Sequence, residues 1–261
     1  VVTVLDMQYK RFPQDVSWLA ARAMDMLYPL AARRAVSVVA ISEFAKSEAV
    51  HFLNIPPEKV SVTLLAADPS FGKKADAPPA AVRDAPYLLC VAHSYPHKNI
   101  PLLIRAFNRL TAQIPHRLVL VGKARLGEPE VLAALRDSPA GRVLRFPDVH
   151  FRDLKALYQA ADWLIFPSLY EGFGLPVLEA MCAGTPVLTT REASIPEIGG
   201  DAVLYADGRD EAAFAEAIRT AIAMPAAERE QLIASARDRA ATFTWAASAG
   251  QLLQILTEAA K

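Results

Sequence analysis

Short apolar runs rich in β-branched residues alternate with segments of helical periodicity along most of this chain, and this alternation restricts the fold more than any other feature. One group of such runs follows residue 86, at 87–92, 117–121, 142–146, 163–166, 186–189 and 202–205. An earlier group lies at 1–5, 36–41 and 60–63. Strands that alternate with helices form parallel sheets with helices on both faces. The sequence therefore predicts an α/β fold, whose ligands bind at the carboxyl ends of the strands.

Helical patterns fill the spaces between these strands. They lie at 15–34, 42–52, 100–113, 130–137, 153–161, 176–183 and 210–223, and a helical tail over 226–261 breaks near 242–245. Ser42 is placed to cap the second helix, because its hydroxyl can accept a hydrogen bond from the first turn. Proline removes a backbone donor, so Pro29 is expected to kink or end the first helix.

The two groups of strands are separated by a segment rich in proline and alanine, a composition typical of a linker. We predict a partial N-terminal domain over 1–68, a linker over 69–84, a second domain over 85–242 and a final helix over 243–261. The chain begins at Val1 without Met, a charged leader or a cleavage site. We therefore expect this start to be an internal edge of a longer protein.

Composition excludes several classes of protein. The apolar fraction of 53% over 261 residues is enough for a substantial core and excludes a disordered chain. Lys plus Arg and Asp plus Glu both number 28, and this balance argues against a general nucleic-acid binder. No apolar run is long enough to span a membrane. With Cys90 and Cys182 alone, no disulfide framework forms, which indicates a reducing compartment.

The segment 167–181 carries the strongest chemical signal. It follows a predicted strand and opens a helix at Pro176, a residue suited to the first helical turn. Gly172 and Gly174 let backbone N–H groups approach a ligand closely. A helix N-terminus adds about half a positive charge. These features together predict an anion pocket suited to phosphate.

Two carboxylates flank this pocket. Glu171 lies in the loop before the helix and Glu179 about one turn inside it, so both are able to face the same ligand. Carboxylates accept hydrogen bonds from paired hydroxyls, which suggests two sugars joined by phosphates. From the glycine spacing alone, a purely structural turn with Glu179 in solvent is an equal alternative.

The motif from Glu171 to Glu179, around Gly-Phe-Gly-Leu-Pro, resembles that of the retaining GT-B glycosyltransferases of family 4, the glycosyl transferases group 1. Further segments resemble this family in the same order, over roughly residues 85–260: 96–99, 119–123, 153–158, 184–187, 194–197 and 243–245. Residues 40–46 are similar to the last strand–helix unit of the family's acceptor domain. Leu5 stands where related enzymes have an active-site histidine, and this departs from the family pattern.

The resemblance implies a GT-B fold, with a Rossmann-like parallel sheet in the donor domain, a partial N-terminal acceptor domain and a final helix that crosses back to it. It implies transfer of a hexose from a nucleoside-diphosphate sugar to a hydroxyl of a saccharide or lipid-linked acceptor, with retention. No cofactor and no metal are expected, and no Asp-x-Asp pair occurs in the chain. The protein is expected in the cytoplasm. The helix that ends at Arg33 and Arg34 either packs on a domain, which we favour, or touches the inner membrane face.

Roles carried over from the family concern both ends of the donor. Glu179 would bind the ribose, with Leu175 packed beside it, and Val149 would lie near the base. Glu171, with the backbone of Gly172, Phe173 and Gly174, would hold the transferred sugar and the distal phosphate. Lys98 would neutralise charge on the leaving diphosphate. His93 stands near the position of a second basic residue in related enzymes.

Three alternatives accompany this interpretation. A metal site at His93 and His97 is rejected, because Pro96 lies between them and no third ligand has a fitting offset. A nucleotide-binding module without transferase activity remains open. A GT-B sugar-nucleotide epimerase also remains open, because Glu171 near a sugar hydroxyl suits either reaction.

Overall fold

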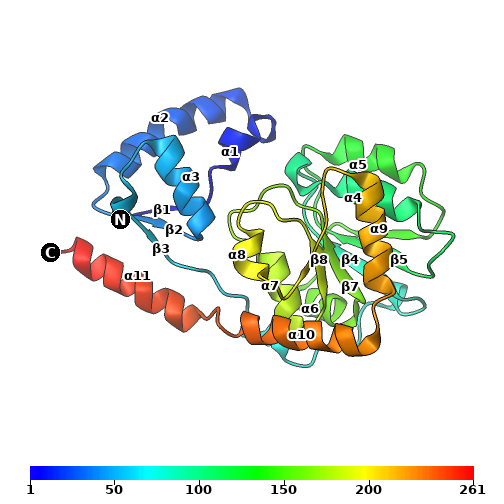
Figure 1. The fold of residues 1–261 in the computed structure, drawn as a ribbon. Helices are drawn as coiled ribbons and strands as arrows, with labels where there is room; N and C mark the ends of the chain where they lie inside the picture. Colours follow the sequence, from blue (N-terminus) through cyan, green and yellow to red (C-terminus); the bar gives the residue numbers. More distant parts are fainter.

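The structure, a computed structural model, describes all 261 residues and contains two parallel sheets (Figure 1). All nine strands lie where the sequence predicts them. They are β1 (Val2–Val4), β2 (Val38–Ala40), β3 (Val60–Val62), β4 (Tyr87–Val91), β5 (Arg117–Val121), β6 (Val143–Phe146), β7 (Trp163–Phe166), β8 (Val187–Thr189) and β9 (Leu204–Tyr205).

The helices fill the connections between the strands. The α-helices are α1 (Gln8–Arg11), α2 (Trp18–Arg34), α3 (Glu43–Leu53), α4 (Ile100–Asn108), α5 (Glu128–Leu135), α6 (Phe151–Ala160), α7 (Leu175–Ala183), α8 (Ile195–Gly199), α9 (Glu211–Ile222), α10 (Ala226–Ala240) and α11 (Trp245–Ala259). Short 3-10 helices are η1 (Pro13–Asp15), η2 (Pro57–Lys59), η3 (Pro69–Gly72), η4 (Ala80–Val82) and η5 (Pro96–Lys98).

The larger sheet has the strand order β6-β5-β4-β7-β8-β9, and every neighbouring pair is parallel. The chain first adds strands on one side of β4 and then reverses to add them on the other. In doubly wound sheets of this kind, ligands bind outside the carboxyl ends of the strands where the order reverses. The predicted α/β fold with parallel sheets is confirmed.

Helices cover both faces of the larger sheet. Successive residues of a strand point to opposite faces. Accordingly, Leu88 and Cys90 of β4 pack in a cluster with α4, α5 and α9, whereas Tyr87 and Leu89 pack with α6, α7 and α10. This second cluster continues into the smaller sheet, whose order is β1-β2-β3, also parallel. One core therefore joins both sheets.

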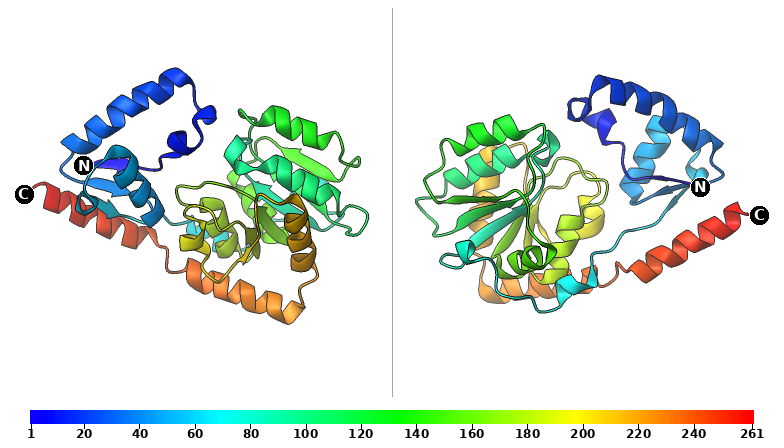
Figure 2. Two further views of the ribbon diagram at one scale, coloured as in Figure 1. Left: turned by 45° about the horizontal axis from the view of Figure 1, so that its top comes forward. Right: turned by 180° about the vertical axis from the view of Figure 1, so that it is seen from behind.

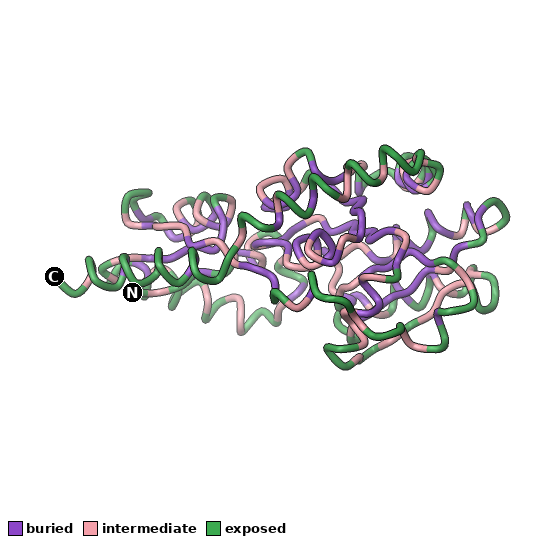
Figure 3. Tube along the Cα trace, turned by 90° about the horizontal axis from the view of Figure 1, so that it is seen from below, coloured by how far each residue is buried: buried purple, intermediate pink, exposed green.

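We call the part with the smaller sheet, residues 1–65, the N-terminal unit, and the part with the larger sheet, residues 87–240, the C-terminal unit. The chain passes between them twice, through η3 and η4 and again between α10 and α11 (Figures 1 and 2). Helix α11 returns to the N-terminal unit, where both termini lie. The tube in Figure 3 is mostly exposed along α11 and buried through the sheets.

Most helix ends agree with the sequence analysis. Ser42 caps α3 by accepting a hydrogen bond from the Ala45 N–H at 2.9 Å, as predicted. Helix α2 runs to Arg34, the predicted end, and Pro29 lies inside it and does not end it. The proline removes one backbone donor, and because α2 is largely exposed, water can hydrogen-bond the carbonyl that loses its partner.

Candidate active site

A cavity of about 510 Å³ opens at the carboxyl ends of β4, β5 and β6. Its lining comes from the loops after these strands, from η5, from the first turns of α7 and from the N-terminal unit. The lining residues are Gln8, Val91, Ala92, His93, Tyr95, His97, Lys98, Val121, Gly122, Lys123, Pro147, Asp148, Val149, Leu154, Leu175, Pro176 and Glu179. The cavity therefore lies at the edge where a doubly wound sheet binds its ligand.

The turn after β5 requires glycine. Gly122 has a φ of 146°, and a Cβ atom there would lie 2.1 Å from the Ala92 carbonyl oxygen at the end of β4. This close approach brings Lys123 to the cavity wall, where its Nζ lies 3.3 Å from Asp148 Oδ2. Lys123 is a cation at the site that the sequence analysis did not assign.

The first turn of α7 points at the cavity without a capping side chain. Gly174 precedes the helix with a φ of 104°, and Pro176 occupies the first turn as predicted. Gly184 ends the helix with a φ of 80°. Unpaired N–H groups and the helix dipole favour an anion at such an end.

Glu179 lines the cavity from the second turn of α7. Its Oε2 accepts a hydrogen bond of 2.8 Å from the Tyr158 hydroxyl, a partner that the sequence analysis missed. Burial raises the pKa of Glu179 to about 7, and the Tyr158 hydrogen bond acts in the opposite direction. The solvent-exposed alternative for Glu179 is therefore excluded.

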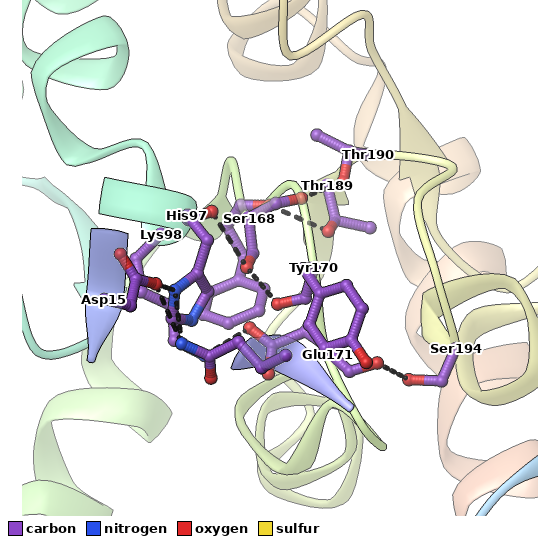
Figure 4. A network of polar contacts seen from close by, with 11 residues as sticks. Asp15, His97, Lys98, Ser168, Tyr170, Glu171, Thr189, Thr190 and Ser194 are labelled. Carbon is purple, nitrogen blue, oxygen red and sulfur yellow. Dashed lines mark hydrogen bonds and ion pairs between the residues drawn. The ribbon is translucent and has the colours of Figure 1, made fainter. Parts of the chain in front are cut away.

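Lys98 and Glu171 form an ion pair (Figure 4). Lys98 Nζ lies 2.6 Å from Glu171 Oε1, and the two side chains are only 19% and 9% exposed. Lys98 lines the cavity, whereas Glu171 lies behind it and is not part of the lining. The structure thus places Glu179 and Lys98 directly on the cavity and connects Glu171 to it through Lys98.

The loop of Gly172, Phe173 and Gly174 packs against protein and does not line this cavity. Phe173 is buried and meets Phe243 edge to face, with ring centroids 6.1 Å apart. Ser42 of the N-terminal unit donates a hydrogen bond of 2.7 Å to the Gly172 carbonyl. The loop is therefore held in place from both sides.

Leu5, at the family's histidine position, lies beside this same loop. A Cβ atom on Gly172 would lie 2.6 Å from the Leu5 carbonyl oxygen and 3.0 Å from Asp6 Cβ. The Leu5 side chain itself is 60% exposed. The backbone at position 5 is close to the predicted sugar site, but its side chain offers no group for acid–base chemistry.

His93 and Val149 both line the cavity, as the sequence analysis expects of donor-binding residues. The Nδ1 atom of His93 accepts a hydrogen bond of 3.0 Å from the Lys123 backbone N–H. Partial burial, followed by the nearby Arg125 and Lys123, lowers the pKa of His93. A lowered pKa leaves this ring a neutral hydrogen-bond donor at neutral pH, so it does not replace the charge of an arginine.

The N-terminal unit supplies a polar cluster beside η5. Asp15 Oδ2 lies 2.6 Å from His97 Nδ1, and Gln8 Nε2 donates a hydrogen bond of 2.8 Å to the same oxygen. Burial and the adjacent Lys98 lower the pKa of His97, while the hydrogen bond to Asp15 acts to raise it. Gln8 begins α1 and Asp15 ends η1, and no local sequence signal marks either as a site residue.

No group of three His, Cys, Asp or Glu side chains in this structure is arranged to hold a metal ion. None of its helices combines the length and apolar character that a membrane crossing requires.

Comparisons with known proteins agree with this architecture. Residues 73–239 match the family described as glycosyl transferases group 1. O-antigen chain mannosyltransferase B of Escherichia coli is 34% identical over 182 residues, which cover 66% of this chain and 48% of that protein. O-antigen chain mannosyltransferase RfbU of Salmonella typhimurium is 29% identical over 230 residues, which cover 86% of this chain and 61% of that protein. The chain thus spans about half to three fifths of the length of these two relatives.

Solved structures share the fold. Anabaena HepE, solved in complex with UDP and glucose, superposes with a TM-score of 0.81 at 22% identity, covering 98% of this chain and 71% of HepE. Sucrose-phosphate synthase of Thermosynechococcus elongatus gives a TM-score of 0.80 at 23% identity, covering 98% of this chain and 67% of that one. Together with the family match over most of the C-terminal unit, these findings show that the chain belongs to the glycosyl transferases group 1 and has their GT-B fold.

Proposed function

We propose that this protein is a retaining glycosyltransferase, which moves a hexose from a nucleoside-diphosphate sugar to a hydroxyl of a saccharide or a lipid-linked saccharide. The observation that carries the proposal is the convergence of Lys98, Glu179 and the uncapped start of α7 on one cavity at the carboxyl edge of the sheet. Membership of the glycosyl transferases group 1 supports the same reaction class.

The donor would lie across this cavity. A ribose would donate its two hydroxyls to Glu179, with Leu175 packed beside it and the base near Val149. The diphosphate would occupy the space between Lys98 and the first turn of α7, where positive charge is available from both sides. The hexose would then extend toward Glu171 and the backbone of residues 172–174.

Catalysis in this proposal is electrostatic. The bond between the anomeric carbon and the phosphate oxygen breaks, and the acceptor oxygen bonds to the same face of that carbon. The acceptor proton passes to the departing phosphate oxygen. Negative charge grows on the diphosphate along this path, and Lys98 with the α7 dipole would stabilise it more strongly in the transition state than in the ground state. No metal or cofactor has a step here.

Two names among the relatives guide the choice of donor. Both O-antigen relatives are named mannosyltransferases, so a nucleoside-diphosphate mannose is the first donor to test. Both names refer to an O-antigen chain, so a saccharide is the first acceptor to test. A lipid-linked saccharide, the other acceptor we propose, would bring the protein to the inner face of a membrane from the cytoplasm.

Helix α2 is the candidate for such a membrane contact. Its Trp18, Leu19 and Met26 are exposed, and Arg33 and Arg34 end it. Exposed apolar and basic residues on one helix suit an anionic membrane surface. Wild-type protein should cosediment with vesicles rich in anionic lipid, and a Trp18→Ser, Leu19→Ser variant should not. If wild type stays in the supernatant, the membrane contact is wrong.

The reaction itself is tested by incubating the protein with mannosyl and glucosyl donors of uridine, guanosine and adenosine diphosphate and a panel of alkyl glycoside acceptors. We expect a new glycoside whose anomeric configuration, measured by NMR, equals that of the donor. An inverted product would contradict retention. Binding without any product would indicate a nucleotide-binding module, and a new sugar nucleotide would indicate an epimerase.

A further inference from the structure

The buried contact between Asp15 and His97 joins the two units beside Lys98. Asp15 ends η1 in the N-terminal unit, and His97 lies in η5, directly before Lys98. Their side chains are 0% and 3% exposed, and Oδ2 of Asp15 lies 2.6 Å from Nδ1 of His97. Figure 4 shows the pair next to Lys98 and Glu171.

Both the backbone and the ring of His97 make contacts with neighbouring residues. Its carbonyl accepts a hydrogen bond of 2.8 Å from the Leu169 N–H, in the loop that continues to Glu171. Its ring stacks on Tyr95, with centroids 5.7 Å apart, and meets Phe12 of the N-terminal unit at 5.6 Å. His97 is thus the point at which η5, the Glu171 loop and the N-terminal unit meet.

Two polar atoms lie within hydrogen-bond distance of His97 Nδ1: Asp15 Oδ2 at 2.6 Å and Gln8 Nε2 at 3.1 Å. An ionised carboxylate only accepts hydrogen bonds, so for an ionised Asp15 the shorter contact places the ring proton on Nδ1, and Gln8 donates to Oδ2. The second oxygen, Oδ1, is buried without a hydrogen-bond partner. The contact with His97, supported by Gln8, is therefore the main interaction that holds this carboxylate in place.

We infer that Asp15 is a positioning residue for transfer: by holding His97, it fixes η5 so that Lys98 keeps its place on the wall of the donor cavity. This inference rests on the proposed function. Misplacing a catalytic group by about 1 Å can cost about 100-fold in rate, so the small shift allowed by loss of the contact is expected to matter. The residues proposed to contact the nucleoside, Glu179, Leu175 and Val149, all belong to the C-terminal unit, so nucleoside-diphosphate affinity should change little.

A closed interface also excludes water from the reacting sugar. If Asp15 holds the units together around the donor, its loss should let water replace the acceptor hydroxyl. The same bond to phosphate then breaks, and free hexose leaves in place of the glycoside. The ratio of donor hydrolysis to transfer reports this directly, and a residue that only stabilises the fold would not alter it.

The first test uses wild-type protein and needs no activity. Long-range ¹H–¹⁵N spectra of the histidine rings, with His97→Gln to assign the signal, should show His97 protonated on Nδ1. Asp15→Asn should shift that signal and leave those of the other four histidines unchanged. A His97 ring without a proton on Nδ1 in the wild type would overturn the inference, even if the protein is a transferase.

The second test compares Asp15→Ala, Asp15→Asn and His97→Gln with a control, Asp25→Asn, which alters an exposed ion pair to Lys10 in the same unit. We expect kcat to fall about tenfold or more in Asp15→Ala and His97→Gln, and less in Asp15→Asn. Nucleoside-diphosphate affinity should be unchanged, and the ratio of donor hydrolysis to transfer should rise.

Unchanged kcat in a folded variant, or loss of affinity in parallel with kcat, would overturn the inference about Asp15. If Asp15→Ala does not fold, the isosteric Asp15→Asn and His97→Gln decide the outcome. Failure of the proposed function itself would appear differently, as wild-type protein that binds no nucleotide.

Discussion

At the scale of single residues, Glu179 shows how burial and function conflict in the cavity. A carboxylate that accepts two ribose hydroxyls must be ionised, yet burial raises its pKa to about 7. We expect nucleoside-diphosphate affinity to increase as pH rises through about 7, because deprotonation creates the acceptor. Calorimetry between pH 5.5 and 8.5 measures this.

In Glu179→Gln the binding free energy of the nucleoside diphosphate should be weaker by about 1.5–3 kcal/mol, and the increase in affinity near pH 7 should be absent. If Glu179→Gln shows the same increase in affinity near pH 7, the increase reflects ionisation of the phosphate and not of Glu179.

The same pKa shift has a consequence for stability. The folded-state pKa of Glu179, about 7, lies above its ordinary value of 4.5. The stability contributed by the protonated form is therefore fully present below pH 4.5 and is lost as pH rises through 7. Glu179→Gln should thus be more stable than wild type at pH 8, by up to about 3 kcal/mol, and equal to it at pH 4. Urea titrations at both pH values check the sign.

Lys98 should separate catalysis from binding. Lys98→Ala is expected to lower kcat about 100-fold and to weaken donor binding less, because negative charge on the diphosphate grows toward the transition state. Lys74→Ala is the control and should leave kcat unchanged, since Lys74 is exposed and lies outside the cavity. A rise in KM with unchanged kcat for Lys98→Ala would indicate uniform binding instead.

Local chemistry accounts for which site residues could be predicted. Glu179 was predictable from its place about one turn inside the helix after a strand, whereas Lys98 was assigned only through the resemblance to the family; both line the cavity. Gln8, Asp15 and Tyr158 were missed because each acts through a partner far away in the chain, and nothing local indicates that partner. His97 has a partner that the sequence could not indicate, because its Nδ1 lies 2.6 Å from Asp15 Oδ2 of the N-terminal unit.

At the scale of elements, strand positions were the most predictable feature and short helices the least. Buried strands of a parallel sheet are continuous apolar runs, so they stand out between polar connections. Helices α1 and α8 are too short to show a 3.6-residue period, and they were not predicted. Of the two effects expected of Pro29, a kink or an end, the end does not occur, because an exposed helix tolerates the loss of one backbone hydrogen bond.

The start of α3 depends on a residue from the other unit. Glu197 of α8 accepts hydrogen bonds from the backbone N–H groups of Glu43 and Phe44, at 2.8 and 2.6 Å, in addition to the Ser42 cap. A carboxylate at a helix N-terminus contributes about 1 kcal/mol. Glu197→Ala should lower the free energy of unfolding by about that amount, whereas Glu230→Ala on the exposed face of α10 should not. Equal denaturation midpoints for both variants would contradict this role.

At the scale of the whole molecule, we propose that residues 1–68 and 85–242 are domains joined by the linker 69–84. Gln159 of α6 holds this linker: its Nε2 donates to the carbonyls of Phe71 and Lys73 at 2.7 and 2.8 Å, and its Oε1 accepts from the Ala75 N–H at 2.9 Å. Lys73 and Lys74 are exposed there.

Limited trypsin digestion tests this arrangement. We expect the first cuts after Lys73 or Lys74, and faster cutting in Gln159→Ala, because proteases require a segment that is free to leave its neighbours. Mass spectrometry of the early fragments identifies the sites. First cuts within residues 85–242 would contradict the division into domains.

We propose that the protein itself, through Lys98 and the start of α7, supplies the positive charge that holds a nucleoside diphosphate in this cavity. Calorimetric titration of UDP, GDP and ADP in excess EDTA tests this proposal. At least one should bind, magnesium or manganese should change its affinity little, and Glu179→Ala and Lys98→Ala should each weaken it. Absence of binding in EDTA with recovery on adding manganese, or affinity unaffected by both substitutions, would contradict the claim.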